Sequence, residues 1–329
     1  MDLRVTPPWD NGRMSKAHEI VKNGISLVGF FKRYPDDEAA EAQLEAWRWP
    51  EGPRCPHCDS ANVSVVISRR PQPYRCRTCR RHFSFKTDTP MHDSKLGAQT
   101  WLLALFLIVS NPKGRSSVQL AADLGITQKS AWHVGHRIRE ALASGSLPGF
   151  EGPVEVDETF IGGKAKNMHA AKRRERIHGR GAVDKTPVVG VKDRASGKVA
   201  AEPTTDTTSA TLTGIVSDTT RPGSTVFTDG DRGYDPLKEM GHLHAKVMHS
   251  VGEYVRGPVS TNGIENFWSG LKRTYIGTYH WWSDDHLHRY VDEHAFRYNQ
   301  RSRHVTDRMR DAAQAMNGRR LPWRELVGA

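Results

Sequence analysis

The chain has 329 residues, more than the roughly 100–200 typical of one domain, which predicts two or three domains with separate cores. Its 37% hydrophobic and 26% charged residues are typical of a soluble globular protein, and its longest apolar run, residues 101–109, is too short to cross a bilayer. The net charge of +11 indicates a polyanionic partner; nucleic acid fits better than an anionic membrane, because no stretch has the basic and apolar faces of a membrane-surface helix. Because residues 1–16 lack the features of a signal peptide, we expect a cytoplasmic protein.

Residues 1–50 form the first predicted region, which is helical. One or two helices are expected within residues 17–49, and Asp36 and Asp37 after Pro35 form a plausible helix start. The sequence PEGPRCPHC then ends the helical pattern.

Residues 51–88 hold all four cysteines of the chain. Cys55 and Cys58 form one C-x₂-C pair, and Cys76 and Cys79 form a second pair after 17 intervening residues. This spacing predicts a zinc ribbon, in which four thiolates close a tetrahedral Zn²⁺ shell and make the site structural. Four unrelated free cysteines are the alternative, and His57 and His82 are expected to remain outside the metal shell. Arginines on both sides of the second pair predict contacts with DNA phosphates.

The pattern of residues 89–146 predicts a helical region that contains a helix-turn-helix-like segment. An apolar helix is expected near residues 96–110, followed by a helix with small Ala121, a turn at Gly125 and a second helix opened by Thr127. In the DNA-binding form of this motif the second helix enters the major groove. The side chains expected on its exposed side are Gln128, Lys129, Ser130, His133 and Arg137. A helical hairpin that only packs has the same pattern, so both interpretations stand.

The sequence changes character after a Gly-, Ser- and Pro-rich linker at residues 144–153. Strands are expected at residues 153–163, 186–193, 198–204, 224–230 and 245–249, with helices near 208–217, 235–240, 261–273 and 284–300. This order predicts an α/β domain over residues 153–305 whose last strands are parallel. Residues 306–329 are expected to form a C-terminal tail.

Acidic side chains lie within one of these strands and at the end of another. In VEVDETF, strand alternation separates two valines, Val154 and Val156, from three polar residues, Glu155, Asp157 and Thr159. A carboxylate within an apolar strand is costly unless a metal or solvent compensates for it. Asp229 ends a second apolar run, at the edge where open α/β sheets bind ligands, although a turn or helix-cap role is the alternative and Asp231 is a local competitor.

The segment STNGIENFWSGLKR (260–273) supplies a third set of polar groups. On a helix, Glu265 and Lys272 share one face because they are seven residues apart, and Asn262 lies about 60° away. Two strand aspartates and a helix glutamate can hold two Mg²⁺ or Mn²⁺ ions about 3.5–4 Å apart, and a nearby lysine can contact the phosphate. A surface helix with an N-terminal carboxylate is the alternative.

Further residues predict contacts with DNA. The basic segment 164–185 has eight Lys or Arg residues, including Lys172, Arg173 and Arg174, although a solvated loop would have the same composition. Trp281 and Trp282 are adjacent and cannot both face inward on one strand, so at least one is expected to be available to DNA or a partner subunit. Trp268 is expected mainly in the core.

These motifs resemble one family, the prokaryotic DDE-type insertion-sequence transposases that join a zinc ribbon to a ribonuclease H-like catalytic domain. The resemblance covers residues 25–305 and is carried by CPHC, CRTCRRHFS, VEVDETFIGG, VFTDGDRGY, TNGIENFWSGLKR, GTYHWWS and FRYNQR. It implies that Asp157 and Asp229 are the first two metal ligands and that the third is Asn262 or Glu265. Chemistry favours Glu265, because an anionic oxygen binds Mg²⁺ better than an amide does.

The resemblance further implies an enzyme that cleaves transposon ends and joins the freed 3′-hydroxyl to target DNA. Lys272 and Arg273 on the 261–273 helix are expected beside the DNA, and assembly on paired ends suggests a homodimer or a larger complex. Two alternatives remain, a non-enzymatic DNA-binding regulator and a metal-dependent nuclease without joining activity.

Overall fold

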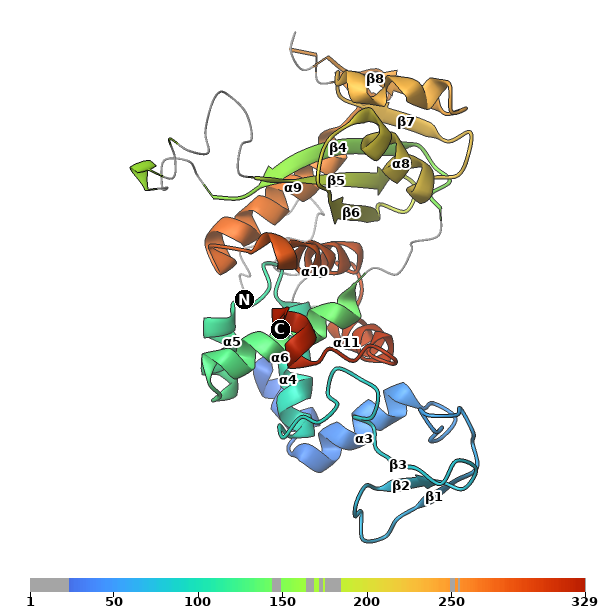
Figure 1. The fold of residues 1–329 in the computed structure, drawn as a ribbon, viewed down its shortest axis with the longest axis vertical. Helices are drawn as coiled ribbons and strands as arrows, with labels where there is room; N and C mark the ends of the chain where they lie inside the picture. The colour runs from blue at the N-terminus through green and yellow to red at the C-terminus, as the bar shows by residue number, and fades with distance from the viewer. Residues whose placement is uncertain are drawn as a thin grey trace, which may run out of the picture.

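The computed structural model describes residues 24–143, 149–163, 169–171, 174, 185–248, 252–253 and 255–328. A small three-stranded sheet lies at one end of the molecule, helices lie in the middle, and a five-stranded sheet lies at the other end (Figure 1). No helix in these described ranges has the length and apolar character needed to span a membrane. The structure is therefore an assembly of helical and α/β parts preceded by a small cysteine-bearing module.

Two short helices precede the cysteines, α2 (Leu27–Arg33) and α3 (Asp37–Arg48). The predicted start of the second helix is confirmed, because the Asp36 side chain accepts a hydrogen bond from the Ala39 N–H at 2.8 Å. Such an N-cap is worth about 1 kcal/mol, since it satisfies a backbone donor that the helix itself cannot pair. The chain then forms three antiparallel strands, β1 (Val63–Val65), β2 (Tyr74–Cys76) and β3 (His82–Phe83).

The middle of the molecule is organised around α4 (Ala98–Ser110), which is buried from Trp101 to Val109. This accounts for the long apolar run of the sequence, which here is covered by protein on all sides. Two further helices pack on it, α5 (Ser117–Leu124) and α6 (Gln128–Leu142). They are joined by a short turn in which Gly125 has a φ of 64°, a left-handed conformation that glycine adopts without strain.

The C-terminal residues correct the expectation of a tail over 306–329. Helix α11 (Val305–Ala315) packs against α3, α4 and α6, and a short helix α12 (Trp323–Val327) follows it. Val305, Met309 and Ala312 are buried in the same apolar cluster as α4. The helices in the middle therefore take part of their core from the end of the chain.

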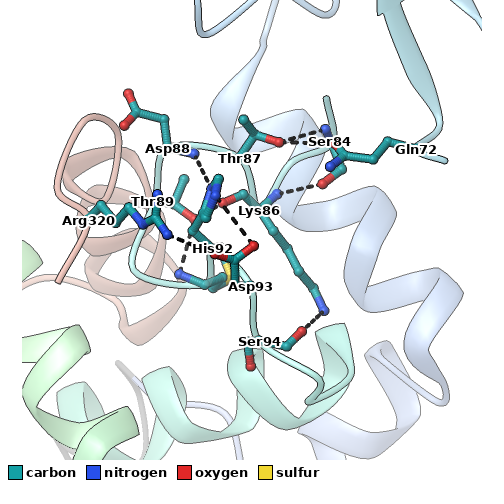
Figure 2. Close-up of polar contacts among 11 residues, drawn as sticks. Gln72, Ser84, Lys86, Thr87, Asp88, Thr89, His92, Asp93, Ser94 and Arg320 are labelled. Carbon is teal, nitrogen blue, oxygen red and sulfur yellow. Dashed lines mark hydrogen bonds and ion pairs between the residues drawn. The ribbon is translucent and has the colours of Figure 1, made fainter. Parts of the chain in front are cut away.

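A polar loop after β3 connects the cysteine-bearing module to α4 (Figure 2). The Lys86 ammonium donates to the carbonyls of Ser94 and Leu96, at 3.4 and 2.6 Å, which closes the loop on itself. Arg320, from the C-terminal segment, bonds to Asp93 at 2.7 Å. The Arg320–Asp93 bond holds the loop against the C-terminal segment.

The five-stranded sheet has the order β6-β5-β4-β7-β8. Its strands are β4 (Val154–Ile161), β5 (Thr186–Asp193), β6 (Val199–Pro203), β7 (Thr225–Thr228) and β8 (Leu243–Lys246). β4, β5 and β6 pair antiparallel, whereas β7 pairs parallel with both β4 and β8. The predicted mixed α/β arrangement is thus confirmed, including its parallel last strands.

Helices cover both faces of this sheet. On one face lie α8 (Ser209–Thr219) and the 3₁₀ helix η2 (Arg232–Lys238), packed on Val154 and Val156. On the other lie α9 (Asn262–Thr274) and α10 (Leu287–Asn299). A π-helical turn, η4 (Tyr275–Tyr279), a 3₁₀ turn, η5 (Asp284–His286), and a small hairpin, β9 (Val255–Arg256) and β10 (Val259–Ser260), complete this part. The predicted separation of the β4 valines from its polar residues is confirmed by this packing.

Candidate active site and zinc site

The four cysteines converge on one point at the end of the small sheet. Their sulfur atoms all lie within 4.8 Å of one another, with Sγ–Sγ distances of 3.6 Å for Cys55–Cys79 and for Cys58–Cys76. The backbone N–H groups of Cys79 and Thr78 help lower the pKa of the Cys76 thiol to about 6, because amide donors stabilise a thiolate. Four mutually close sulfurs, one of them favouring the thiolate, fit a closed Zn²⁺ shell with no open position for a substrate.

Exposed arginines surround this sulfur cluster. Arg69 pairs with Glu41 of α3, which ties the long β1–β2 loop to the helix. Five further arginines of the module are exposed, Arg70, Arg75, Arg77, Arg80 and Arg81. Such a surface is suited to binding phosphates.

A second candidate site lies where β4 and β7 run side by side. The parallel register pairs Glu155 with Phe227, and continued by two residues it sets Asp157 beside Asp229, which directly follows β7. Asp229 Oδ1 also accepts a bond from the Asp231 N–H at 3.0 Å, so the turn predicted as its alternative role is present as well. The sheet itself therefore places the two aspartates at the same edge.

The electrostatics of Asp157 show that further acids gather there. Burial raises the pKa of Asp157 to about 8, and the charges of Glu158, Asp229 and Glu265 raise it as well. A carboxyl group surrounded by like charges is easier to ionise once a cation is present. Asp157, Asp229 and Glu265 thus lie close enough to influence one another, although they belong to three different elements.

Helix α9 brings its carboxylate to a cleft of about 480 Å³. The cleft is lined by Asp157, Glu158, Thr159, Glu265, Trp268, Ser269, Lys272, Arg273 and Ile276. Glu265 accepts a bond from the Thr261 hydroxyl at 3.1 Å, whereas Asn262 is exposed at the first position of the helix and is not part of the lining. Carboxylates and two basic side chains therefore face one cleft, as the helical spacing of Glu265 and Lys272 predicts.

Glu158 is a member of this site that the sequence reasoning did not identify. It projects to the face of β4 opposite Asp157, and its Oε2 accepts a bond from the Tyr234 hydroxyl at 2.8 Å. Burial raises its pKa, and the charges of Asp229 and Asp231 add to this effect. The sequence did contain a signal for this residue, because strand alternation places Glu158 on the same face as Val154 and Val156. A buried carboxylate on that apolar face is costly unless it has a partner.

The N-terminal turn of α9 is fixed to the sheet by a buried carboxylate. Glu155 Oε2 accepts a bond from the Ile264 N–H at 2.9 Å, and its Oε1 accepts one from Arg194 Nε at 2.7 Å. Gly263 is required by this approach, because a Cβ there would lie 2.5 Å from Glu155 Oε2. Glu155 therefore positions the helix that carries Glu265 and does not itself line the cleft.

The donor set of the cleft fits hard divalent cations such as Mg²⁺ or Mn²⁺, which bind carboxylate oxygens. Within the described ranges, the cysteine cluster is the one set of three or more His, Cys, Asp or Glu ligand atoms that all lie within 4.8 Å of one another. The acids of the cleft are more widely spaced. A pair of ions about 3.5–4 Å apart can contact carboxylates that are too far apart to share one ion, because each ion binds oxygens about 2.1 Å away.

The surface of α6 differs from the expectation for a groove-reading helix. Gln128, Lys129 and Ser130 are exposed at its start, as predicted. His133 and Arg137 are partly covered by the C-terminal segment: His133 packs edge-on against the Trp323 ring, and Arg137 Nε donates to the Leu321 carbonyl at 3.0 Å. The exposed side predicted for this helix is thus reduced to its first turn.

The two adjacent tryptophans separate as predicted, with one inside and one outside. Trp281 is 67% exposed, whereas Trp282 is 5% exposed and stacks on Tyr290 with ring centroids 4.9 Å apart. Trp282 is therefore corrected from a DNA contact to a core residue. Of the basic segment, Arg174 is exposed, and Lys172 and Arg173 lie outside the described residues.

The fold and the sites define a protein that joins a four-cysteine zinc ribbon to an α/β domain with an acidic cleft. Residues 35–82 match the transposase zinc-ribbon domain, and residues 149–299 match the ISXO2-like transposase domain. A Halobacterium salinarum protein described as an uncharacterized protein in transposable element ISH50 is 31% identical over 268 residues, which are 79% of this chain and 90% of that protein. A Haemophilus influenzae uncharacterized transposase-like protein is 33% identical over 91 residues, 28% of this chain and 72% of that protein. The chain belongs to the ISXO2-like family of insertion-sequence transposases with an N-terminal zinc ribbon.

Proposed function

We propose that this transposase cleaves transposon ends and joins the freed 3′-hydroxyl to target DNA by two-metal-ion phosphoryl transfer in the α9 cleft. The observation that carries this proposal is the gathering of acids at the buried Asp157, where burial and then the charges of Glu158, Asp229 and Glu265 together raise its pKa to about 8. The strand order β6-β5-β4-β7-β8, with three antiparallel strands followed by two parallel ones, supports a ribonuclease H-like domain as the scaffold.

In this proposal Asp157, Asp229 and Glu265 hold the ions. Glu265 is preferred to Asn262, because Glu265 lines the cleft and its charge acts on Asp157, whereas Asn262 is exposed outside the lining. Divalent ions bound to these oxygens would stabilise charge on the attacking and leaving oxygens of the phosphodiester. Lys272 and Arg273, on the wall of the same cleft, bind the flanking phosphates and orient the DNA.

The DNA-binding surface that we propose extends beyond the cleft. It comprises the exposed arginines of the zinc ribbon, Gln128, Lys129 and Ser130 at the start of α6, Arg174, and Trp281. The net charge of +11 supports a polyanionic partner along this length. We further propose that the enzyme acts as a homodimer or larger assembly, since the two ends of the element must be held as a pair.

Substitution of Asp157 by alanine tests the assignment. With DNA that carries the repeats flanking the element, and with Mn²⁺ or Mg²⁺, strand joining should be lost while DNA binding persists. A non-enzymatic regulator would bind equally well with or without this substitution and would join nothing. Supplying cleaved ends with a free 3′-hydroxyl separates the remaining case, because a nuclease without joining activity would leave them unjoined.

A further inference from the structure

Trp268 makes a polar contact inside the proposed active site. It lies on α9 with 3% of its surface exposed, and its indole Nε1–H donates to Asp157 Oδ2 at 3.1 Å. Among the described side chains, it is the one that donates a hydrogen bond to this carboxylate. The ring also packs against Phe267, with centroids 5.0 Å apart, as expected for a core residue. Core packing alone does not require the N–H to point at an acid.

The neighbouring strand leaves space for this arrangement. Gly190 on β5 is the direct partner of Asp157 on β4, and the indole lies over it. A Cβ at position 190 would lie 2.6 Å from both Cζ2 and Cη2 of Trp268, and 3.0 Å from Ile264 Cδ1. Any other residue at this position would displace the ring from the carboxylate. The glycine and the tryptophan therefore form one steric unit next to Asp157.

We propose that Trp268 is a positioning residue that holds Oδ2 of Asp157 so that Oδ1 is presented to a divalent cation. This inference rests on the proposed metal-dependent function. Hydrogen bonds to a metal-binding carboxylate fix its orientation, and losing such a partner typically costs about 10–100-fold in metal affinity.

The test is a Trp268→Phe substitution in the full zinc-loaded chain, which removes the N–H and keeps an aromatic ring. Two quantities would be measured. The first is the Mn²⁺ concentration that gives half-maximal joining of precleaved ends. The second is the Mn²⁺ retained by the enzyme–DNA complex, obtained from the free Mn²⁺ signal in electron paramagnetic resonance. The midpoint should rise about 10-fold or more, with most of the rate recovered at saturating Mn²⁺. A purely structural role would instead lower the maximal rate or DNA binding without moving the midpoint.

Trp282→Phe is the matched control, because Trp282 is equally buried in the same core and its Nε1 has no hydrogen-bond partner among the described residues. Its midpoint should stay within about twofold of the parent, since no polar contact is lost. Gly190→Ala retains the indole N–H but displaces the ring, so it should shift the Mn²⁺ midpoint in the same direction as Trp268→Phe. Thermal melts check that all variants fold.

The proposal for Trp268 is overturned if Trp268→Phe and Trp282→Phe have the same Mn²⁺ midpoint and the same Mn²⁺ retention. Asp157→Ala serves as the separate reference for the proposed function. If that variant still retains Mn²⁺ and joins ends, the metal assignment itself fails, whatever Trp268→Phe does.

Discussion

Glu293 offers the sharpest test of how the helical region is attached to the α/β domain. It lies on α10, is fully buried, and pairs with both Arg139 of α6 and Arg297 of its own helix. The Tyr279 hydroxyl donates to its Oε1 at 2.8 Å. One carboxylate thus compensates two guanidinium groups that are themselves at most 5% exposed.

We predict that Glu293→Gln destabilises this contact by about 3–5 kcal/mol, because it leaves two buried cations without a counter-charge while hardly changing the packed volume. This is a large part of the roughly 5–15 kcal/mol that stabilises a typical domain. Burial raises the pKa of Glu293, but the charges of Arg297 and Arg139 outweigh burial and the net pKa is lowered. The stabilisation is therefore present above the unfolded carboxyl pKa of about 4.3 and is lost as the pH falls through the lower folded value.

Hydrogen exchange of the α6 and α10 amides is the appropriate assay, since a chain of several parts need not unfold in one step. At neutral pH the opening free energy of both helices should fall in Glu293→Gln. The control is Asp307→Asn, which removes a surface pair with Arg310 at 2.8 Å whose side chains are 39% and 43% exposed. Such a pair is worth about 0–1 kcal/mol. If Glu293→Gln changes exchange no more than this control does, the proposed role of the buried cluster is wrong.

Two further predictions concern the zinc site and the metal site proposed at Asp157. Cys76→Ser should abolish zinc binding and the protection of the β1–β3 amides from hydrogen exchange, because the ribbon core is small and depends on the metal. The five-stranded sheet should stay protected. Metal analysis and hydrogen exchange check this, and a ribbon that remains protected without zinc would contradict it. Asp157→Asn should raise the melting temperature at pH 8 without Mg²⁺ or Mn²⁺, by an amount equivalent to at most about 5 kcal/mol, since raising the pKa from about 3.9 in the unfolded chain to about 8 in the folded one makes ionisation of the aspartate unfavourable for folding. The difference should vanish near about pH 2–3, below the unfolded-state pKa of about 3.9, where Asp157 is protonated in both states. Equal melting temperatures at pH 8 would refute the raised pKa of Asp157.

Local patterns in the sequence were sufficient to predict the sheet and much of the candidate site. Alternation in β4 separates Val154 from Asp157 because a strand has a period of two residues, and a shift by one residue would turn Asp157 toward the apolar face packed by α8. The interval between Glu265 and Lys272 places both on the cleft because a helix returns to the same face after seven residues. These periodicities are properties of the backbone, so they did not depend on knowing the partner elements.

The features that the sequence did not predict depend on contacts between distant segments. The cover over His133 and Arg137 comes from Leu321 and Trp323, and no local pattern indicates that α6 and the C-terminal segment meet. The same holds for Trp282, whose partner Tyr290 lies across η5 on α10. A short apolar or aromatic segment has the same local pattern whether it is exposed or buried against a remote helix.

One stretch of α9 shows how several such constraints meet at the proposed active site. Gly263 allows the helix to approach Glu155, the Ile264 N–H donates the anchoring bond to Glu155, and Glu265 then faces the cleft. One turn later Trp268 contacts Asp157 across the space left by Gly190. Because the anchor and the contact both connect α9 to β4, the spacing between Glu265 and Asp157 is set by rigid elements, which is the arrangement that metal-dependent phosphoryl transfer requires.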